Sequence, residues 1–181
     1  SKLGHKVRII TSSQIHNSNI NLIENNELYL EKSIDDVHYT FVRTCRYKGN
    51  GIKRIYSMVQ FSHNVMKTCQ KLLESGDIPD LIYASSPEIF SAFYSVRFAK
   101  QHDIPKIVEI RDLWPESIVS FTKFSNKNII IKMLYQLEKW IYKNSDEIVF
   151  TMEGGKQYIL DKGWEKEVDL GKIYNINNGV D

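Results

Sequence analysis

The sequence predicts an α/β fold: a Rossmann-like parallel sheet flanked by helices, with a β-hairpin insertion. Three observations predict it. Short apolar strands alternate along the chain with segments of helical period, the pattern of a parallel sheet covered on both faces. The 181 residues are enough for one domain with a sizeable core. The composition, 42% hydrophobic and 25% charged, is that of an ordinary soluble globular protein.

The chain starts with a pattern that fits the middle of a fold. Gly4 is placed as a residue that ends a helix, and residues 7–11 then read as a strand. Because a fold does not begin with a helix stop, we expect that this chain lacks an upstream strand and helix. Residues 12–26 are polar and rich in Asn, which indicates a long loop.

A hairpin is expected next. Residues 28–31 and 37–42 read as two strands around Asp35 and Asp36, and the second strand alternates clearly. Residues 46–51 then form a basic loop with two glycines.

A long amphipathic helix is predicted over residues 52–73, and Gly76 ends it. One stripe of this helix, expected to face the interior, consists of Ile55, Val59, Ser62, Met66, Cys69 and Leu73. The opposite stripe is polar and consists of Lys53, Ser57, Gln60, Asn64, Lys67 and Lys71.

The second half of the chain alternates strictly between strands and helices. The predicted strands are residues 80–85, 105–110, 146–151 and 172–176. The predicted helices are residues 86–102, 127–143 and 154–163, with a further short helix whose first turn would hold Glu116. For the first of these helices we expect Ser86 as the N-cap and Pro87 at the first helical position.

Charge and cysteine content exclude several classes of function. The net charge of +2 and the lack of a recognisable module argue against a nucleic-acid partner. Cys45 and Cys69 have no metal-type spacing, and the five histidines form no ligand cluster, so we expect no metal. We expect both thiols to be free in a reducing, cytoplasmic compartment. No apolar run approaches the ~18 residues of a membrane span.

Polar residues follow the predicted parallel strands, where ligands of such sheets bind. Ser85 and Ser86 precede a helix N-terminus, which favours an anion or a sugar hydroxyl; the alternative is that Ser86 only caps the helix. Glu153 precedes a Gly pair, with simple complementarity to a helix dipole as its alternative. Asn178 and Gly179 follow the last strand.

The strand at residues 105–110 ends in Arg111 and Asp112, and Trp114 and Pro115 follow. Arg offers a fork of donors that suits a phosphate or a carboxylate, and Asp112 can accept from sugar hydroxyls. The alternative for this pair is a structural salt bridge or loop cap. Trp114 and Pro115 are expected to fix the loop, either beside a site or as a hydrophobic plug.

Motifs for other chemistries are absent from the sequence. Residues 154–156 lack the full spaced pattern of a P-loop, and no Gly-x-Gly-x-x-Gly follows a strand. The missing dinucleotide fingerprint disfavours an oxidoreductase. The helix at 127–143 combines lysines with aromatic residues and could lie on an anionic membrane, or could be an ordinary solvated face. Its relevant residues are Lys127, Lys132, Tyr135, Lys139, Trp140, Tyr142 and Lys143.

Three segments resemble glycosyltransferase family 4. They are residues 81–119, which contain "EIRDLWPES", residues 134–163, and residues 172–181, which end in "NNGVD". Within that family they look like the bacterial subgroup that makes O-antigen and capsule sugars, such as the N-acetyl-L-fucosaminyl transferases. The resemblance runs in order through most of the chain but is not specific at residues 12–50.

This resemblance implies one half of a GT-B fold, in which two Rossmann-like domains face each other across a cleft. Residues 1–176 would be the N-terminal, acceptor-side domain, lacking the family's first strand and Gly-rich loop. Residues 177–181 would begin the crossover to a C-terminal, donor-binding domain that this chain lacks, so the chain by itself is expected to be inactive.

The activity implied is transfer of a sugar from a nucleotide-sugar donor to a lipid-linked glycan acceptor, with retention of configuration and without a metal or cofactor. Such an enzyme of bacterial capsule, O-antigen or lipopolysaccharide synthesis would work in the cytoplasm, at the inner face of the membrane. Many family members carry His where Arg111 stands. Arg111 and Asp112 are therefore the expected catalytic residues, and the expected substrate contacts are Ser85, Ser86, Glu116, Glu153, Asn178 and Gly179.

A second function remains open, that of a non-catalytic Rossmann-like binding or regulatory domain. A receiver domain would need an acidic pocket with a strand-end Asp and a later Lys, and the sequence offers no convincing set of this kind.

Overall fold

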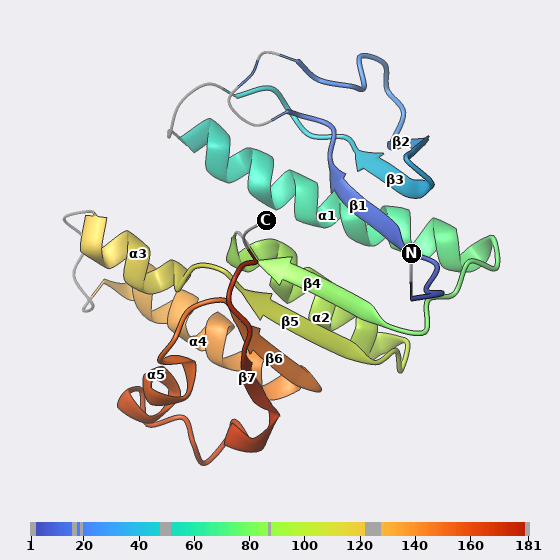
Figure 1. Ribbon diagram of the computed structural model, residues 1–181. Helices are drawn as coiled ribbons and strands as arrows, with labels where there is room; N and C mark the ends of the chain where they lie inside the picture. Colours follow the sequence, from blue (N-terminus) through green and yellow to red (C-terminus); the bar gives the residue numbers. More distant parts are fainter. Residues whose placement is uncertain are drawn as a thin grey trace. The chain divides into compact units, whose positions relative to one another are not determined.

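The computed structural model describes residues 3–15, 18, 20–47, 52–86, 88–121 and 128–179. The chain divides into two compact units, Ser1–Ile78 and Pro79–Asp181, which we call unit 1 and unit 2 and describe separately (Figure 1). The predicted domain of residues 1–176, with a crossover at 177–181, stays a prediction, and Val180 and Asp181 lie outside the described residues.

Unit 1 contains a three-stranded sheet of its own, in the order β1-β3-β2. Strand β1 (Arg8–Ser12) runs parallel to β3 (Val37–Val42), and β2 (Tyr29–Ile34) runs antiparallel to it. The predicted hairpin is confirmed: Ile34 pairs with Val37, and both residues between them have positive φ, 49° at Asp35 and 61° at Asp36. Such a two-residue turn matches the twist of the flanking strands.

Helix α1 (Ile52–Glu74) forms where the periodicity predicts it, but the buried face differs from the expected one. Ile55 and Val59 of the expected inner stripe are 50% and 39% exposed, whereas Ser57 and Asn64 of the polar stripe are buried. The physical reason lies in the segment after β3. Its backbone groups are bonded by polar side chains of α1, which lets that polar face be buried without loss of hydrogen bonds.

Unit 2 contains the predicted parallel sheet, flanked by helices, which confirms the fold class (Figure 1). Its strands lie in chain order: β4 (Ile82–Ser86), β5 (Lys106–Ile110), β6 (Glu147–Phe150) and β7 (Ile173–Asn175). The helices are α2 (Ile89–Gln101), α3 (Trp114–Phe121), α4 (Ile129–Asn144) and α5 (Gly155–Asp161), with a 3-10 turn at Leu170–Lys172. All three strand pairings of this sheet are parallel.

The core of unit 2 lies between one face of the sheet and helices α2 and α4. Alternate strand residues such as Val108 and Ile110 point into it and meet Val96 of α2 and Ile141 of α4. Trp164, after α5, also belongs to this cluster. A core of this size, formed by interdigitated apolar side chains, fixes the sheet and therefore the positions of the strand ends.

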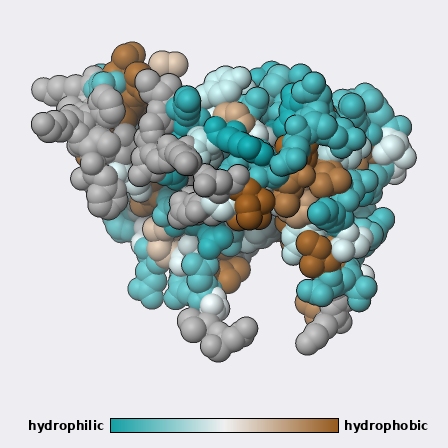
Figure 2. All heavy atoms as spheres, turned by 90° about the horizontal axis from the view of Figure 1, so that it is seen from above, coloured by the Kyte–Doolittle hydropathy of each residue, from teal (hydrophilic) through white to brown (hydrophobic). Residues whose placement is uncertain are grey.

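The surface in Figure 2 is mostly hydrophilic, with separate apolar areas. Among the described residues, the most exposed large apolar side chains of unit 2 include Ile129, Ile130 and Met133 near the start of α4. None of the described helices is both long and apolar enough to span a bilayer.

Candidate functional site

The carboxyl ends of all four strands of unit 2 lie at one edge of the sheet, because the strands are parallel and neighbours. The predicted residues of strands β4, β5, β6 and β7 are thus brought to the same edge, which we call the site edge. It holds Ser85, Ser86, Arg111, Asp112, Glu153, Asn178 and Gly179. This is the place where open α/β sheets bind their ligands.

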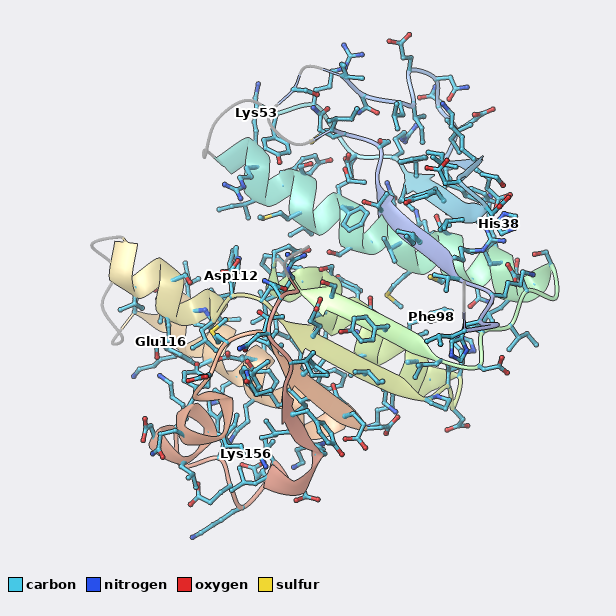
Figure 3. All side chains as sticks on the ribbon, viewed as in Figure 1. His38, Lys53, Phe98, Asp112, Glu116 and Lys156 are labelled. Carbon is cyan, nitrogen blue, oxygen red and sulfur yellow. The ribbon has the colours of Figure 1, made fainter. Side chains whose placement is uncertain are left out.

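Arg111 and Asp112 follow directly on the buried Ile110, and both are exposed. Figure 3 shows Asp112 at the end of β5. Among the described residues, neither side chain forms a salt bridge within 4.0 Å, so the alternative of a structural salt bridge is not observed there. The pair therefore presents its donors and acceptors at the site edge.

The loop that carries this pair is anchored by apolar packing. The Trp114 ring meets the edge of Phe90 at 6.0 Å between centroids, with 67° between the ring planes, and Pro115 is buried. Asp112, Trp114 and Pro115 line a small void of about 10 Å³ above the core. Trp114 and Pro115 are hydrophobic plugs, as one of the two interpretations predicts, and they hold the end of β5 in place.

Glu116 lies in the first turn of α3, as predicted, but its carboxylate faces the other helices (Figure 3). It is bonded to Lys162, just after α5, and to Tyr135 of α4. Burial alone would raise the pKa of Glu116, but these bonds and the charge of Lys162 lower it below its ordinary value. Its expected contact with the acceptor stays a prediction, and its observed role is to join three helices.

Glu138 of α4 is the centre of this cluster and is only 3% exposed. Its two oxygens accept hydrogen bonds from the hydroxyls of Tyr142, at 2.7 Å, and Tyr158, at 2.8 Å. Burial raises the pKa of Glu138 to about 7, although both tyrosines and the charge of Lys162 oppose the rise. The cluster binds α4 and α5 together next to α3, and so supports the loop above it.

Sequence reasoning missed a polar group on the sheet itself. Ser85 and Glu109 are paired across β4 and β5, and the Ser85 hydroxyl donates to the Glu109 carboxylate. Tyr83, two residues before Ser85 and thus on the same face, also bonds Glu109. The pKa of Tyr83 is raised, mainly by burial and to a smaller extent by the Glu109 carboxylate, and the charge of Arg111 opposes this rise. The signal in the sequence was an acidic residue inside a strand, two positions before Arg111.

The predicted N-cap at Ser86 is wrong. Helix α2 begins at Ile89, and its N-cap is Glu88, whose carboxylate accepts from the backbone N–H of Phe90 at 2.7 Å and of Ser91 at 2.9 Å. The Glu88 carboxylate bonds the second and third N–H groups of the helix, as an N-cap side chain does, and its charge also complements the helix dipole. The N–H groups of Phe90 and Ser91, at the observed start of α2, are therefore bonded by Glu88. Pro87 lies outside the described residues.

The remaining predicted contacts come after β6 and β7. Glu153 is exposed in the turn before α5, and Gly154 takes φ +90° to start that helix. Asn178 and Gly179 are exposed beyond β7. The structure brings these residues to the site edge, and their roles as substrate contacts stay predictions.

The basic and aromatic face predicted for α4 is only partly available at the surface. Lys139 and Lys143 both pair with Glu167, at 2.7 and 3.0 Å, and Tyr142 is buried. Lys132 is exposed, while Lys127 lies outside the described residues. Peripheral membrane association stays a prediction.

Within the described residues, no group of three or more His, Cys, Asp or Glu side chains is placed to hold a metal ion. Cys45 and Cys69 are both free thiols, as predicted. Burial raises the pKa of Cys69 to about 11, so this thiol stays protonated at neutral pH.

Comparison with solved structures gives a clear match for the fold. A sucrose-phosphate synthase from Thermosynechococcus elongatus superposes with a TM-score of 0.64 over 99% of this chain and 40% of its own length, at 14% sequence identity. A UGT transferase from Siraitia grosvenorii, solved in complex with UDP, covers 81% of this chain and 40% of its own at a TM-score of 0.46 and 12% identity. No protein-family profile and no curated sequence matches the chain.

At this identity the likeness concerns the fold. The chain spans about 40% of the length of either structure. The two sheets described above, a parallel one flanked by helices and a smaller mixed one, therefore form an arrangement of elements found in part of a glycosyltransferase.

Proposed function

We propose that this chain is the acceptor-side, N-terminal part of a retaining glycosyltransferase. In this proposal the intact enzyme moves a sugar from a nucleotide-sugar donor to a lipid-linked glycan in bacterial capsule, O-antigen or lipopolysaccharide synthesis. The observation that carries the proposal is the superposition of 99% of the chain on a glycosyltransferase. The polar residues at the site edge support it, because they lie where such a sheet would meet its substrate.

Arg111 is the proposed centre of the chemistry. Transfer breaks the bond between the sugar C1 and the donor phosphate oxygen and forms a bond from C1 to an acceptor oxygen, whose proton is released. Negative charge develops on the departing nucleotide diphosphate, and a preorganised guanidinium stabilises such charge. Packing of Trp114 and Pro115 holds the backbone of the loop that carries Arg111 and leaves its polar groups available to the substrate.

Asp112 and the Ser85–Glu109 pair are proposed to hold sugar hydroxyls. Carboxylate oxygens accept from such hydroxyls, and the Ser85–Glu109 bond shows that this part of the sheet already orients one hydroxyl. Ser86, Glu153, Asn178 and Gly179 would complete the edge of the site.

The test uses the intact protein with a panel of nucleotide sugars and a lipid-linked acceptor extract, and follows sugar incorporation by mass spectrometry. We expect transfer from one donor, and a loss of about 100-fold or more in kcat for Arg111→Ala. Arg97→Ala, which removes an exposed Arg on α2, is the matched control and should keep wild-type turnover.

Two results would count against the proposal. Undiminished turnover of Arg111→Ala would remove Arg111 from the chemistry. Absence of both transfer and nucleotide-sugar binding, the latter measured by calorimetry, would favour the non-catalytic binding domain instead.

A further inference from the structure

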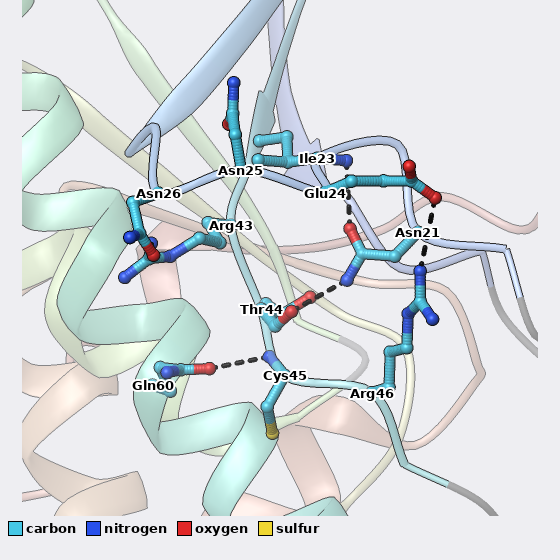
Figure 4. A pocket seen from close by; sticks show the side chains of 10 residues that line it. All are labelled: Asn21, Ile23, Glu24, Asn25, Asn26, Arg43, Thr44, Cys45, Arg46 and Gln60. Atoms are coloured by element: carbon cyan, nitrogen blue, oxygen red, sulfur yellow. Dashed lines mark hydrogen bonds and ion pairs between the residues drawn. The ribbon is translucent and has the colours of Figure 1, made fainter.

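Unit 1 contains an open cavity of about 400 Å³ at the carboxyl end of β3, within the volume range of ligand sites. It lies between two loops, the polar loop before β2 and the segment after β3 (Figure 4). Its lining is polar and includes two arginines, Arg43 and Arg46, together with Glu24, Asn26 and Gln60. None of these residues belongs to the site edge of unit 2.

The backbone that carries the two arginines is held from several sides. Asn64 donates to the carbonyl of Arg43 at 2.8 Å, and Asn21 donates to the carbonyl of Thr44 at 2.8 Å. The N–H of Cys45 donates to Gln60 at 2.6 Å. Further bonds come from Ser13 and Ser57.

The N–H of Arg43 donates to the backbone carbonyl of Leu28 at 2.9 Å, whereas side chains satisfy the backbone groups of the next two residues. This arrangement explains why the polar face of α1 is buried. It also fixes the backbone positions from which the side chains of Arg43 and Arg46 extend. Binding of a ligand would therefore cost no conformational entropy for ordering that backbone.

The guanidinium groups themselves are held only loosely. Arg46 meets Glu24 at 3.4 Å, with the side chains 62% and 82% exposed, and Arg43 donates to the neutral amide oxygen of Asn26 at 3.2 Å. An exposed pair of this kind contributes little stability and is readily exchanged for a better partner. A planar guanidinium forms its strongest bonds in a bidentate pair with a carboxylate or a phosphate.

We propose that this cavity binds an oxyanion, the phosphate or carboxylate of a glycan, through Arg43 and Arg46. In the free protein Glu24 forms a salt bridge with Arg46, and the ligand replaces Glu24 when it binds. The cavity volume, the clamped backbone and the two weakly engaged cations all support it. In the proposed glycosyltransferase the bound anion would be a charged group of the acceptor glycan; that part of the inference rests on the proposed function, whereas anion binding does not.

The test is a titration of the intact protein with inorganic phosphate, with glucuronate and with neutral glucose, followed through the NMR signals of the arginine side-chain N–H groups. We expect saturable shifts at Arg43 and Arg46 with at least one anion and none with glucose. Arg43→Gln and Arg46→Gln should each weaken binding by roughly ten-fold or more, as for lost hydrogen bonds to a charged group.

Two variants make the test specific. Glu24→Gln should tighten binding about two- to five-fold, because the anion no longer competes with an exposed carboxylate. Arg97→Gln changes the net charge by the same amount in unit 2 and should leave the affinity unchanged. Arg43→Lys keeps the positive charge but loses the planar guanidinium that can form two parallel hydrogen bonds. We expect its affinity for the anion to lie between those of the wild type and Arg43→Gln. Unchanged backbone signals outside the cavity check that each variant is folded.

Saturation by phosphate alone would indicate a phosphorylated group, and saturation by glucuronate alone a uronic acid. Shifts that never saturate, equal weakening by Arg97→Gln and Arg43→Gln, or the same shifts with glucose would each overturn the inference. Anion binding without any sugar transfer would leave the cavity standing and remove the proposed function. Sugar transfer without anion binding at Arg43 and Arg46 would support the proposed function and overturn the inference about the cavity.

Discussion

Gly155 shows how the size of one residue determines the packing of α5 next to the site edge. A β-carbon placed on Gly155 would lie 2.4 Å from the ring of Phe150, the buried last residue of β6. Helix α5 can therefore begin against the Phe150 ring in this position because residue 155 has no side chain. The pair of glycines at 154 and 155 is required by left-handed geometry at the first and by close packing at the second.

We expect Gly155→Ala to lower the free energy of unfolding by about 1–3 kcal/mol, because either the Phe150 ring or the start of α5 must move. Gly179→Ala is the control, since its β-carbon would meet nothing within 4 Å, and we expect less than about 0.5 kcal/mol. Chemical denaturation of both variants measures the difference. Equal stability of the two would mean that the Phe150 contact is not tight.

At the scale of the element, helix α2 depends on Glu88. This side chain is 6% exposed and accepts two backbone N–H bonds at the helix start. The strand before it carries Ser85 and Ser86 to the site edge, so the start of α2 and the site share one short connection.

Glu88→Ala should destabilise unit 2 by about 1–2 kcal/mol, because two N–H groups lose their acceptor and the helix loses its negative cap. Glu165→Ala removes an exposed carboxylate elsewhere in unit 2 and should change the stability by less than about 0.5 kcal/mol. Thermal unfolding followed by circular dichroism compares the two. A loss for Glu165→Ala as large as for Glu88→Ala would contradict the capping role.

At the scale of the whole molecule, the chain has two compact units, and their stabilities can be followed separately. The three tryptophans, Trp114, Trp140 and Trp164, all lie in unit 2 and pack against its core. Tryptophan fluorescence therefore reports the unfolding of unit 2. The buried Glu138 gives this unit a pH dependence.

The pKa of Glu138 is about 7 in the folded protein against an ordinary value of 4.5. Between these two pH values the folded state keeps the proton that the unfolded chain releases. Glu138 therefore adds to the free energy of unfolding at low pH, and this stabilisation is fully present below pH 4.5. It is lost as the pH rises to about 7, which lowers the free energy of unfolding by roughly 3 kcal/mol. The groups that face it are Tyr142, Tyr158, Lys162 and Glu116.

Glu138→Gln should remove this loss, because an amide does not titrate; its oxygen can accept from one tyrosine while its NH2 group donates to the hydroxyl of the other. Urea denaturation at pH 4.5, 6 and 8 measures it, and the stability of the variant relative to wild type should increase across the series. Parallel pH curves for the two proteins would show that Glu138 titrates normally.

The order of elements could be predicted from the sequence, whereas the choice of buried face in unit 1 could not. Hydrophobic period and turn residues are local, and they placed the strands and helices of both units to within a few residues. In α1 the local rule failed, because Ser57 and Asn64 find partners in the segment after β3, which is distant in sequence. A side chain's burial depends on such partners as well as on its polarity.

For the site, the sequence by itself determined which residues reach the edge of the parallel sheet, since strand direction and length follow from local pattern. Only the tertiary structure decided what each residue does there: Glu88 rather than Ser86 caps α2, Glu116 turns towards Lys162, and Glu109 joins Ser85. The cavity with Arg43 and Arg46 also depends on tertiary contacts. The partners of Glu116 and Ser85 lie far away in the chain, so no local pattern encodes these two roles, whereas the Glu88 cap is a local bond that depends on where α2 begins.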